Sequence, residues 1–362
     1  MSEKWSAYAG CFLGLAVGDA MGLAVDDKTW DEICAAYGPN GLLGYDLLNG
    51  CAEVTSYTQV AAYVANALLV ANSRGKTDGY IRYITLALRE WAKRQHFPRL
   101  PEKSPLWVSQ LPQLRRKACR DARMLDALRM ETLGTMQVPI NSASSPGAMP
   151  VAAAIALFFE PERMEPAQVG TLAAESLALT HGNPEVFLSG VVLAYSIAGI
   201  LHQPECALKE QFVQANAAMQ AQFGSLFPQQ SQAVAQRVNT AIRLAADKEA
   251  QPRQCMERLG CYTCAECLAG AVYACLKSSE DFDSAMILAV NHSGLSCATG
   301  AITGAIIGAY LGCEALPDFY LESLEAKEPL EQLAKDLTMG ALTAGLFDDD
   351  WDQRYVQGIP TM

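Results

Sequence analysis

Four cysteines in the C-terminal half of the sequence have the spacing of a metal site. Cys261, Cys264 and Cys267 form a Cys-x2-Cys-x2-Cys run, and Cys255 lies six residues upstream of it. Such spacing is typical of zinc or iron–sulfur centres, which thiolates bind. The competing interpretation is a helix over residues 264–277, in which Cys264 and Cys267 are small core residues one turn apart. The sequence leaves both interpretations open, and no metal is assigned to these cysteines.

The charge balance bears on the partners of the protein. Among 362 residues there are 39 Asp and Glu but only 27 Lys and Arg, which gives a formal net charge of −12. An acidic surface disfavours nucleic acid, because binding to phosphates requires cations. A divalent metal or a cationic partner suits the composition better. The sequence contains no Gly-x-Gly-x-x-Gly loop, Walker A loop, Gly-x-Ser-x-Gly elbow or His-Glu-x-x-His pair.

The elements that must position any site are helices. Alanine and leucine dominate the sequence and alternating β-type segments are scarce, which predicts a single all-α domain over residues 1–362. A second, small domain over 76–138, where arginine is frequent, is the alternative. The longest expected loop runs from about residue 97 to 111. Helices are predicted over 57–71, 81–94, 151–159, 167–180, 186–201, 210–223, 232–247, 264–277, 284–289, 299–311 and 330–346.

Two segments carry glycine at every fourth position. The first has Gly10, Gly14, Gly18 and Gly22, and the second has Gly300, Gly304, Gly308 and Gly312. Each glycine costs a helix up to about 1 kcal/mol relative to alanine, so this pattern requires a compensating contact. Glycines spaced by four residues line one face and allow another backbone to approach closely. We expect the two helices to pack together, either for tight packing alone or to present their loop ends to a ligand.

The twelve cysteines are spread along the chain without an export signal, which predicts reduced thiols and a cytoplasmic location. The apolar run over residues 8–25 is interrupted by Asp19 and lacks a signal-peptide cleavage site. Residues 295–313 are uncharged and long enough to resemble a membrane span. Their glycine, alanine, serine and threonine content favours a buried helix, so no membrane association is expected.

Five further segments occur in order along the chain: Gly18-Asp19-Ala20-Met21-Gly22 with the glycines before it, Val54-Thr55-Ser56-Tyr57-Thr58, Asn141-Ser142-Ala143 continuing to Gly147 and Met149, Leu179-Thr180-His181-Gly182, and Asn291 to Cys297. Together they resemble the motifs of the ADP-ribosylglycohydrolase family, which includes dinitrogenase reductase-activating glycohydrolase and the crystallin J1 relatives. The resemblance covers most of the chain. It implies a single-domain, compact orthogonal multi-helix bundle of the ADP-ribosylglycohydrolase type.

The resemblance also implies a catalytic site that this sequence has altered. In the family, a Thr-Asp-Asp segment and an Asp-x-Asp-Ser/Thr segment hold two magnesium ions, which prefer oxygen ligands and orient ribose hydroxyls and a water. Here Ser56 and Tyr57 stand at the first two aspartates, and Leu295 and Cys297 at the second two. A leucine cannot bind a metal, and a thiol is a soft ligand that magnesium disfavours. No cofactor is therefore expected, and magnesium only if the protein is still a hydrolase.

Other motif positions are partly retained. Asp26 stands at a glutamate position of the family and is the candidate catalytic residue, or else a solvated loop carboxylate beside Asp27. Asp19 is interpreted as a buried anchor, and His181 as a hydrogen-bonded structural histidine.

The loop after Asn141 is altered as well. In it, Ser144-Ser145-Pro146 replaces the Gly-Cys-Gly core of the family. The candidate ligand-binding residues are Asp19, Thr55, Ser56, Tyr57, Asn141, Ser142, Gly147, His181, Gly294, Leu295, Ser296 and Cys297.

The leading hypothesis is a pseudoenzyme that has lost the dinuclear magnesium site and binds an ADP-ribose-like small molecule or a protein partner. The first alternative is an active hydrolase that cleaves the glycosidic bond to ribose with an altered site, using new carboxylates such as Glu53 or Asp27. The second is a structural, crystallin-like protein whose pocket is closed around Tyr57 and Leu295. The sequence leaves the oligomeric state open.

Overall fold

All regular structure is helical in the part of the chain that the computed structural model describes, residues 3–48, 50–97, 104, 106–162, 164–344 and 349–356. Contacts of β type in these ranges are limited to two isolated bridges. The predicted all-α fold is confirmed. The helices are α1 (Glu3–Leu23), α2 (Trp30–Tyr37), α3 (Ser56–Ser73), α4 (Tyr80–His96), the 3-10 helix η1 (Trp107–Gln110), α5 (Pro112–Arg115), α6 (Ala122–Leu128), α7 (Met149–Phe158), α8 (Pro166–Ala178), α9 (Pro184–His202), α10 (Leu208–Phe223), α11 (Pro228–Ala246), α12 (Pro252–Leu259), α13 (Cys264–Lys277), α14 (Phe282–Val290), α15 (Ser296–Leu311), the 3-10 helix η2 (Cys313–Ala315), α16 (Asp318–Ser323), α17 (Lys327–Ala344) and α18 (Asp349–Tyr355).

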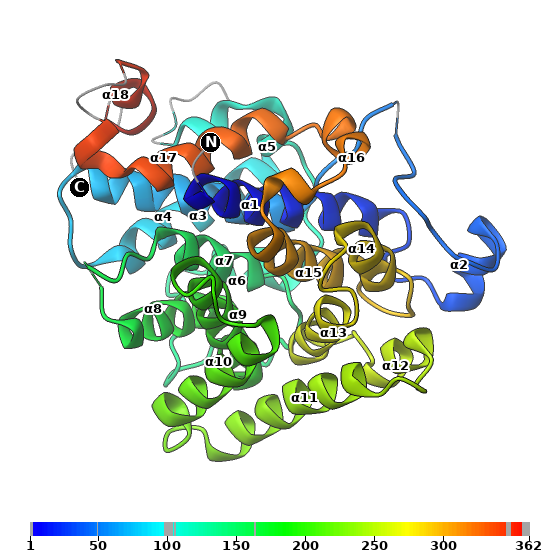
Figure 1. Cartoon of the computed structure of the whole chain (residues 1–362). Helices are drawn as coiled ribbons and strands as arrows, with labels where there is room; N and C mark the ends of the chain where they lie inside the picture. The colour runs from blue at the N-terminus through cyan, green and yellow to red at the C-terminus, as the bar shows by residue number, and fades with distance from the viewer. Residues whose placement is uncertain are drawn as a thin grey trace.

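The two glycine-rich helices, α1 and α15, lie side by side in the centre of the molecule and run antiparallel (Figure 1). Gly10 faces Gly308, Gly14 faces Gly304 and Gly18 faces Gly300, each close to the backbone carbonyl of the other helix. A Cβ atom at any of these glycines would overlap that carbonyl group. The predicted helix pair is confirmed, and the glycine cost is compensated by backbone-to-backbone packing along the whole interface.

Local sequence signals explain where most other helices begin. Proline occupies one of the first two positions of α7, α8, α9, α11 and α12, where its missing N–H costs nothing. Thr29 begins α2 with a capping box to Glu32, and Asn183 caps α9 by accepting from the Glu185 N–H. These caps place several helix starts a few residues before the boundaries expected from hydrophobic periodicity.

Every predicted helix occurs, and the structure adds short ones that the sequence did not reveal. Helices α2, α5, α6, α12, α16 and α18 have at most eight residues each, too few for a clear hydrophobic period. The expected loop over 97–111 lies partly outside the described residues, and its described part contains η1 and is therefore not fully irregular. The last two residues of the helix predicted over 330–346 also lie outside the described residues. Helix α4, in the segment considered as a separate domain, packs against α3 and α8.

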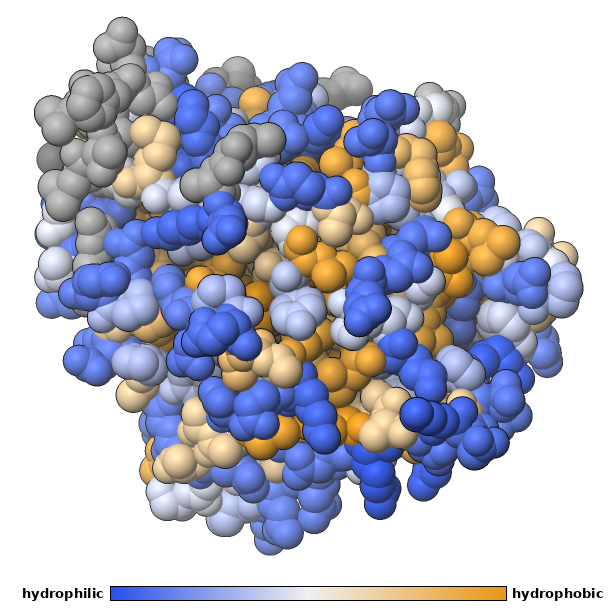
Figure 2. Space-filling view, in the orientation of Figure 1, coloured by the Kyte–Doolittle hydropathy of each residue, from blue (hydrophilic) through white to orange (hydrophobic). Residues whose placement is uncertain are grey.

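Two helices, α1 and α9, are long and apolar enough to span a membrane by length and composition alone. In each, most of the apolar window is buried inside the fold, 83% for α1 and 72% for α9, as in the core helices of soluble proteins. Helix α15 has 16 residues, and Ser296 to Ala309 are buried, as predicted for a core helix. In the view of Figure 2, hydrophilic side chains cover most of the surface and hydrophobic ones show between them.

The glycine interface gives a direct test. Replacing Gly304 by alanine places a methyl group against the backbone of Gly14, and overpacking of this kind costs about 3 kcal/mol, since backbone cannot move aside as a side chain can. Gly44→Ala is the matched control, because its methyl group meets no atom within 4 Å. Chemical denaturation should show a large loss of unfolding free energy for Gly304→Ala only. Equal stabilities of the two variants would contradict the interface.

Candidate functional site

The antiparallel pairing of α1 and α15 brings the loop after α1 to the N-terminus of α15. A Cβ atom at Gly22 would lie 2.6 Å from the Cα atom of Cys297, so the two chain segments touch. Four residues after Gly22, the Asp26 Oδ1 atom accepts a hydrogen bond from the Cys297 N–H at 2.9 Å. The Asp27 N–H donates to the Gly294 carbonyl at 3.0 Å. These contacts gather two of the motif segments into one place.

Asp19 connects α1 to the start of α3. Its carboxylate accepts from the backbone N–H groups of Thr55 and Thr58 at 2.8 and 3.1 Å and from their hydroxyls at 2.6 and 2.7 Å. Complete burial raises the pKa of Asp19 to about 6, although these four hydrogen bonds act in the opposite direction. Asp19 therefore satisfies the free donors at the N-terminus of α3 and fixes the positions of Ser56 and Tyr57.

Ser56 and Tyr57 are buried where they meet the segment before α6. The Ser56 N–H donates to the Ala118 carbonyl at 3.0 Å, and the Ser56 Oγ atom accepts from the Arg120 N–H at 3.0 Å. Tyr57 is only 3% exposed, and burial together with the charge of Asp26 raises the pKa of its hydroxyl. Cys297 is fully buried, and the same two causes raise the pKa of its thiol. Both groups are neutral near physiological pH.

Arg120 places a guanidinium group at the motif site. It pairs with the Asp26 Oδ2 atom through Nη2 and through Nε at 3.1 Å, and its Nη2 atom lies 3.7 Å from Asp27. The Asp26 side chain is 4% exposed, whereas that of Arg120 is 31% exposed, so the cation forms the solvent-facing side of the pair. Burial alone would lower the pKa of Arg120, but the charge of Asp26 more than reverses this. Sequence reasoning missed Arg120, for which the only signal was the frequency of arginine in this region.

The next residue, Asp121, ties the same segment to the loop between α8 and α9. Its Oδ2 atom lies 3.0 Å from His181 Nε2, and its Oδ1 atom caps α6 by accepting from the Arg123 N–H at 3.1 Å. The Thr180 hydroxyl bonds His181 Nδ1 at 2.8 Å, and Ser145 Oγ lies 3.3 Å from Nε2. In a catalytic triad, the serine and the carboxylate bond opposite ring nitrogens of the histidine. Here Asp121 and Ser145 both lie beside Nε2, so the three residues do not form a catalytic triad.

The remaining predicted residues lie in two loops. The Asn141 side chain bonds the backbone of Ala143, Thr180 and Gly182, whereas Ser142 is exposed. A Cβ atom at Gly147 would lie 2.6 Å from the Asp121 Cβ atom, so only glycine fits beside that carboxylate. Gly294 has a φ of 128°, a conformation that favours glycine. Leu295 is half-buried and Ser296 is buried, with its hydroxyl donating to the Val290 carbonyl at 2.8 Å.

The donor set at the motif site does not fit magnesium. Ser56 and Tyr57 offer a hydroxyl each, Leu295 offers no ligand, and Cys297 offers a buried neutral thiol. The neighbouring carboxylates are already engaged, Asp19 by the start of α3, and Asp26 by Arg120 and the Cys297 N–H. Magnesium requires several available oxygen ligands, ideally anionic.

Of the four spaced cysteines, Cys255 lies in α12, Cys261 in the connection after it, and Cys264 and Cys267 at the start of α13. Cys267 Sγ donates to the Cys261 carbonyl at 3.4 Å, and Cys264 Sγ to the Val186 carbonyl at 3.8 Å. Burial raises the pKa values of the Cys261, Cys264 and Cys267 thiols, that of Cys261 to about 12. Among the described residues, no group of three or more His, Cys, Asp or Glu side chains is placed to hold a metal ion.

Comparisons with known proteins add to this geometry. The sequence matches the model of the ADP-ribosylglycohydrolase family over residues 2–345. A search of curated protein sequences gives no match. Among solved structures, an "ADP-ribosylglycohydrolase-related protein complex" is similar, with a TM-score of 0.59 and 22% identity over 93% of this chain and 98% of that chain. At this identity the structural likeness concerns the fold alone.

The Asp121–His181 contact predicts a pH dependence of stability. Burial would raise the pKa of Asp121, but the hydrogen bond and charge of His181 outweigh it and hold the pKa at about 2. A carboxyl group whose pKa is lower in the folded protein than in the unfolded chain stabilises the fold at pH values above its unfolded pKa. That stabilisation is lost as the pH falls through its folded pKa. Between about pH 5 and pH 2 we expect the native protein to lose about 2 kcal/mol more stability than Asp121→Asn. Parallel pH profiles of unfolding free energy for the two proteins would contradict this.

Asp19 gives a second test of the site. Asp19→Asn keeps the shape of the side chain but turns an NH2 group toward the donors of Thr55 and Thr58. We expect about 2 kcal/mol lower unfolding free energy, since a buried donor is left unpaired. Asp78→Asn, at an exposed position, is the matched control. Equal effects of the two substitutions would show that Asp19 does not anchor α3.

Proposed function

Because the chain belongs to the ADP-ribosylglycohydrolase family, we propose that it binds an ADP-ribose-like ligand and has lost the metal-dependent hydrolysis of the family. The observation that carries the proposal is the Arg120 guanidinium, held by Asp26 at the motif site. An arginine there supplies positive charge without any metal, and its planar donors suit phosphate oxygens.

The loss of hydrolysis follows from the chemistry of the replaced positions. Two metal ions would orient a water and the ribose hydroxyls for attack at the anomeric carbon. Neither Tyr57 nor Cys297 carries a negative charge near physiological pH, since burial raises the pKa of both. The carboxylate of Asp26 is occupied by hydrogen bonds from Arg120 and the Cys297 N–H, so its oxygens are not free to accept a proton from water. The site therefore lacks both the metal ligands and a free general base.

The two carboxylates that an altered hydrolase could use are poorly placed. Glu53 forms an ion pair with Arg116 at 2.8 Å, and Asp27 is 69% exposed with its nearest Arg120 atom at 3.7 Å. Asp27 neighbours Asp26, but both carboxylates pair with the Arg120 guanidinium, and Glu53 pairs with Arg116 instead. This supports a binding role over hydrolysis with an altered site.

Binding is supported by exposure of the cation. Arg120 keeps 31% of its side chain accessible while Asp26 is nearly covered. Its Nη1 atom forms no hydrogen bond with a described residue, so this donor is available to an anionic ligand. A diphosphate-bearing ligand would replace solvent there and gain charge-assisted hydrogen bonds.

A structural role without any small ligand is the second candidate. It is favoured by the burial of Tyr57 and Cys297, which are 3% and 0% exposed and fill the volume around Asp26. A protein partner is compatible with either role, because the site would then act as a rigid surface. The titration below separates the two candidates.

Isothermal titration with ADP-ribose, with and without magnesium, tests the proposal. We expect saturable binding whose affinity does not change with magnesium. Arg120→Ala should weaken it at least about tenfold, since charged hydrogen bonds contribute 1.5 kcal/mol or more. Arg120→Lys should retain part of the affinity, and Arg243→Ala, at an exposed position on α11, should leave it unchanged.

Two results would contradict the proposal. Magnesium-dependent release of ADP-ribose from a modified protein would show that hydrolysis is retained. Absence of ADP-ribose binding in a correctly folded protein would favour the structural role.

A further inference from the structure

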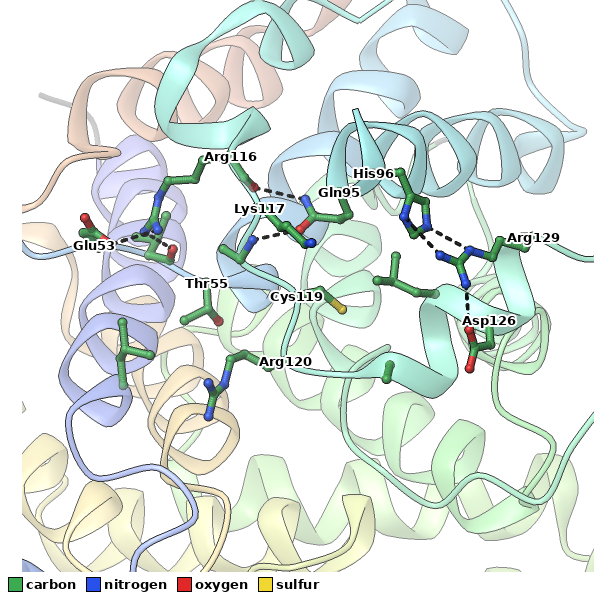
Figure 3. Close-up of a pocket in the computed structure, with 15 residues that line it drawn as sticks. Glu53, Thr55, Gln95, His96, Arg116, Lys117, Cys119, Arg120, Asp126 and Arg129 are labelled. Carbon is green, nitrogen blue, oxygen red and sulfur yellow. Dashed lines mark hydrogen bonds and ion pairs between the residues drawn. The ribbon is translucent and has the colours of Figure 1, made fainter. Parts of the chain in front are cut away.

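A half-open cavity of about 820 Å³ lies beside the N-terminus of α3, lined by residues 116–120, the end of α4 and residues of α6 (Figure 3). Of the residues from the sequence motifs, Val54 and Thr55 line it, and Asp26, Tyr57 and Cys297 do not. Arg120 contributes to its wall between the cavity and the motif site. The cavity is therefore a neighbouring site that the family motifs do not describe.

The lining of this cavity has the opposite charge to the protein as a whole. Arg116, Lys117, Arg120 and Arg129 line it together with two carboxylates, Glu53 and Asp126. The formal net charge of the chain is −12. The three arginines also pair with carboxylates, some of them outside the lining, so Lys117 carries the positive charge that no ion pair with a described residue compensates.

Three of the four cations are held in place by neighbouring groups. Arg116 pairs with Glu325 at 2.7 Å and Glu53 at 2.8 Å, and Arg129 donates from Nε to His96 at 2.9 Å and from Nη1 to Asp126 at 3.1 Å. Arg120 is held by Asp26. Fixed guanidinium groups lose little entropy when a ligand binds, which increases affinity.

Lys117 is the cation that these pairs leave available. It is exposed, lines the cavity between Arg116 and Ala118, and its ammonium forms no hydrogen bond or ion pair with a described residue. A lysine has three donors on a flexible stem, so it can follow a ligand into the cavity. Together with the Nη1 atom of Arg120, it offers donors that no described residue occupies.

We propose that this cavity binds a small molecule through a single phosphate group, with Lys117 and Arg129 among its contacts. A phosphate dianion would compensate the charge of Lys117 and accept hydrogen bonds from both ammonium and guanidinium donors. Glu53 and Asp126 on the lining, and the acidic surface beyond, repel an extended polyanion such as nucleic acid. The volume of about 820 Å³ accommodates a metabolite of the size of a phosphorylated sugar or a mononucleotide.

Calorimetric titration of the full-length protein with inorganic phosphate, at constant ionic strength, tests this site. We expect one binding site, weakened about tenfold by Lys117→Ala and by Arg129→Ala, because each removes a charge-assisted contact. Lys209→Ala, an exposed lysine on α10, is the matched control and should bind as the native protein does. Lys117 is exposed, so its substitution tests binding without disturbing the fold.

Failure of this proposal is separable from failure of the proposed function. Lys117 and Arg129 belong to no motif segment. If Lys117→Ala and Arg129→Ala lose phosphate binding but still bind ADP-ribose, the two ligands occupy separate sites. Absence of phosphate binding by the native protein, or equal binding by native protein and Lys117→Ala, would overturn the proposal.

Discussion

The contact between the backbones of α1 and α15 determines the geometry of everything around the motif site. Gly10, Gly14 and Gly18 face Gly308, Gly304 and Gly300, and no side chain separates the two helices. Two antiparallel helices at backbone contact have a fixed register, since each carbonyl fits beside one glycine of the partner. That register sets the loop after α1 against the N-terminus of α15, where Asp26 meets the Cys297 N–H.

A second constraint is charge balance in the buried region next to this loop. Asp19 is compensated by four donors at the start of α3, and Asp26 by Arg120. A buried carboxylate without such partners would be unstable. Where the family resemblance implies two metal ions among several aspartates, this chain has fewer carboxylates and one arginine. We propose that the replacement changes the kind of cation at this site, from a metal that would position water to a guanidinium that would bind an anion.

The segment 116–122 joins the two sites that we propose. Its backbone pairs with Ser56, Arg120 reaches Asp26, and Asp121 reaches His181. Its other side carries Arg116 and Lys117 into the cavity of Figure 3. One short stretch of chain therefore borders the motif site and forms a wall of the neighbouring cavity. A ligand in either of the two proposed sites would lie against residues that shape the other.

The sequence by itself determined the helical class, the longer helices, the pairing of the two glycine-rich helices and the family. These features depend on local patterns, such as hydrophobic periodicity and glycine at every fourth residue, which can be recognised in the sequence without knowledge of the fold. It also showed that Ser56, Tyr57, Leu295 and Cys297 stand where aspartates were expected. The short helices α2, α12 and α16 were not predicted, because a helix of eight residues or fewer is too short to show a clear hydrophobic periodicity.

Only the tertiary structure decided what surrounds those four residues. Arg120 lies 94 positions from Asp26 in the sequence, and Asp121 lies 60 positions from His181. No local propensity encodes such a pairing, because it depends on how the segment before α6 crosses the N-terminus of α3. The same holds for the spaced cysteines, whose sequence pattern allowed either a metal site or a core helix. Burial, which follows from the packing of α13 with its neighbours, keeps the thiols of Cys261, Cys264 and Cys267 neutral.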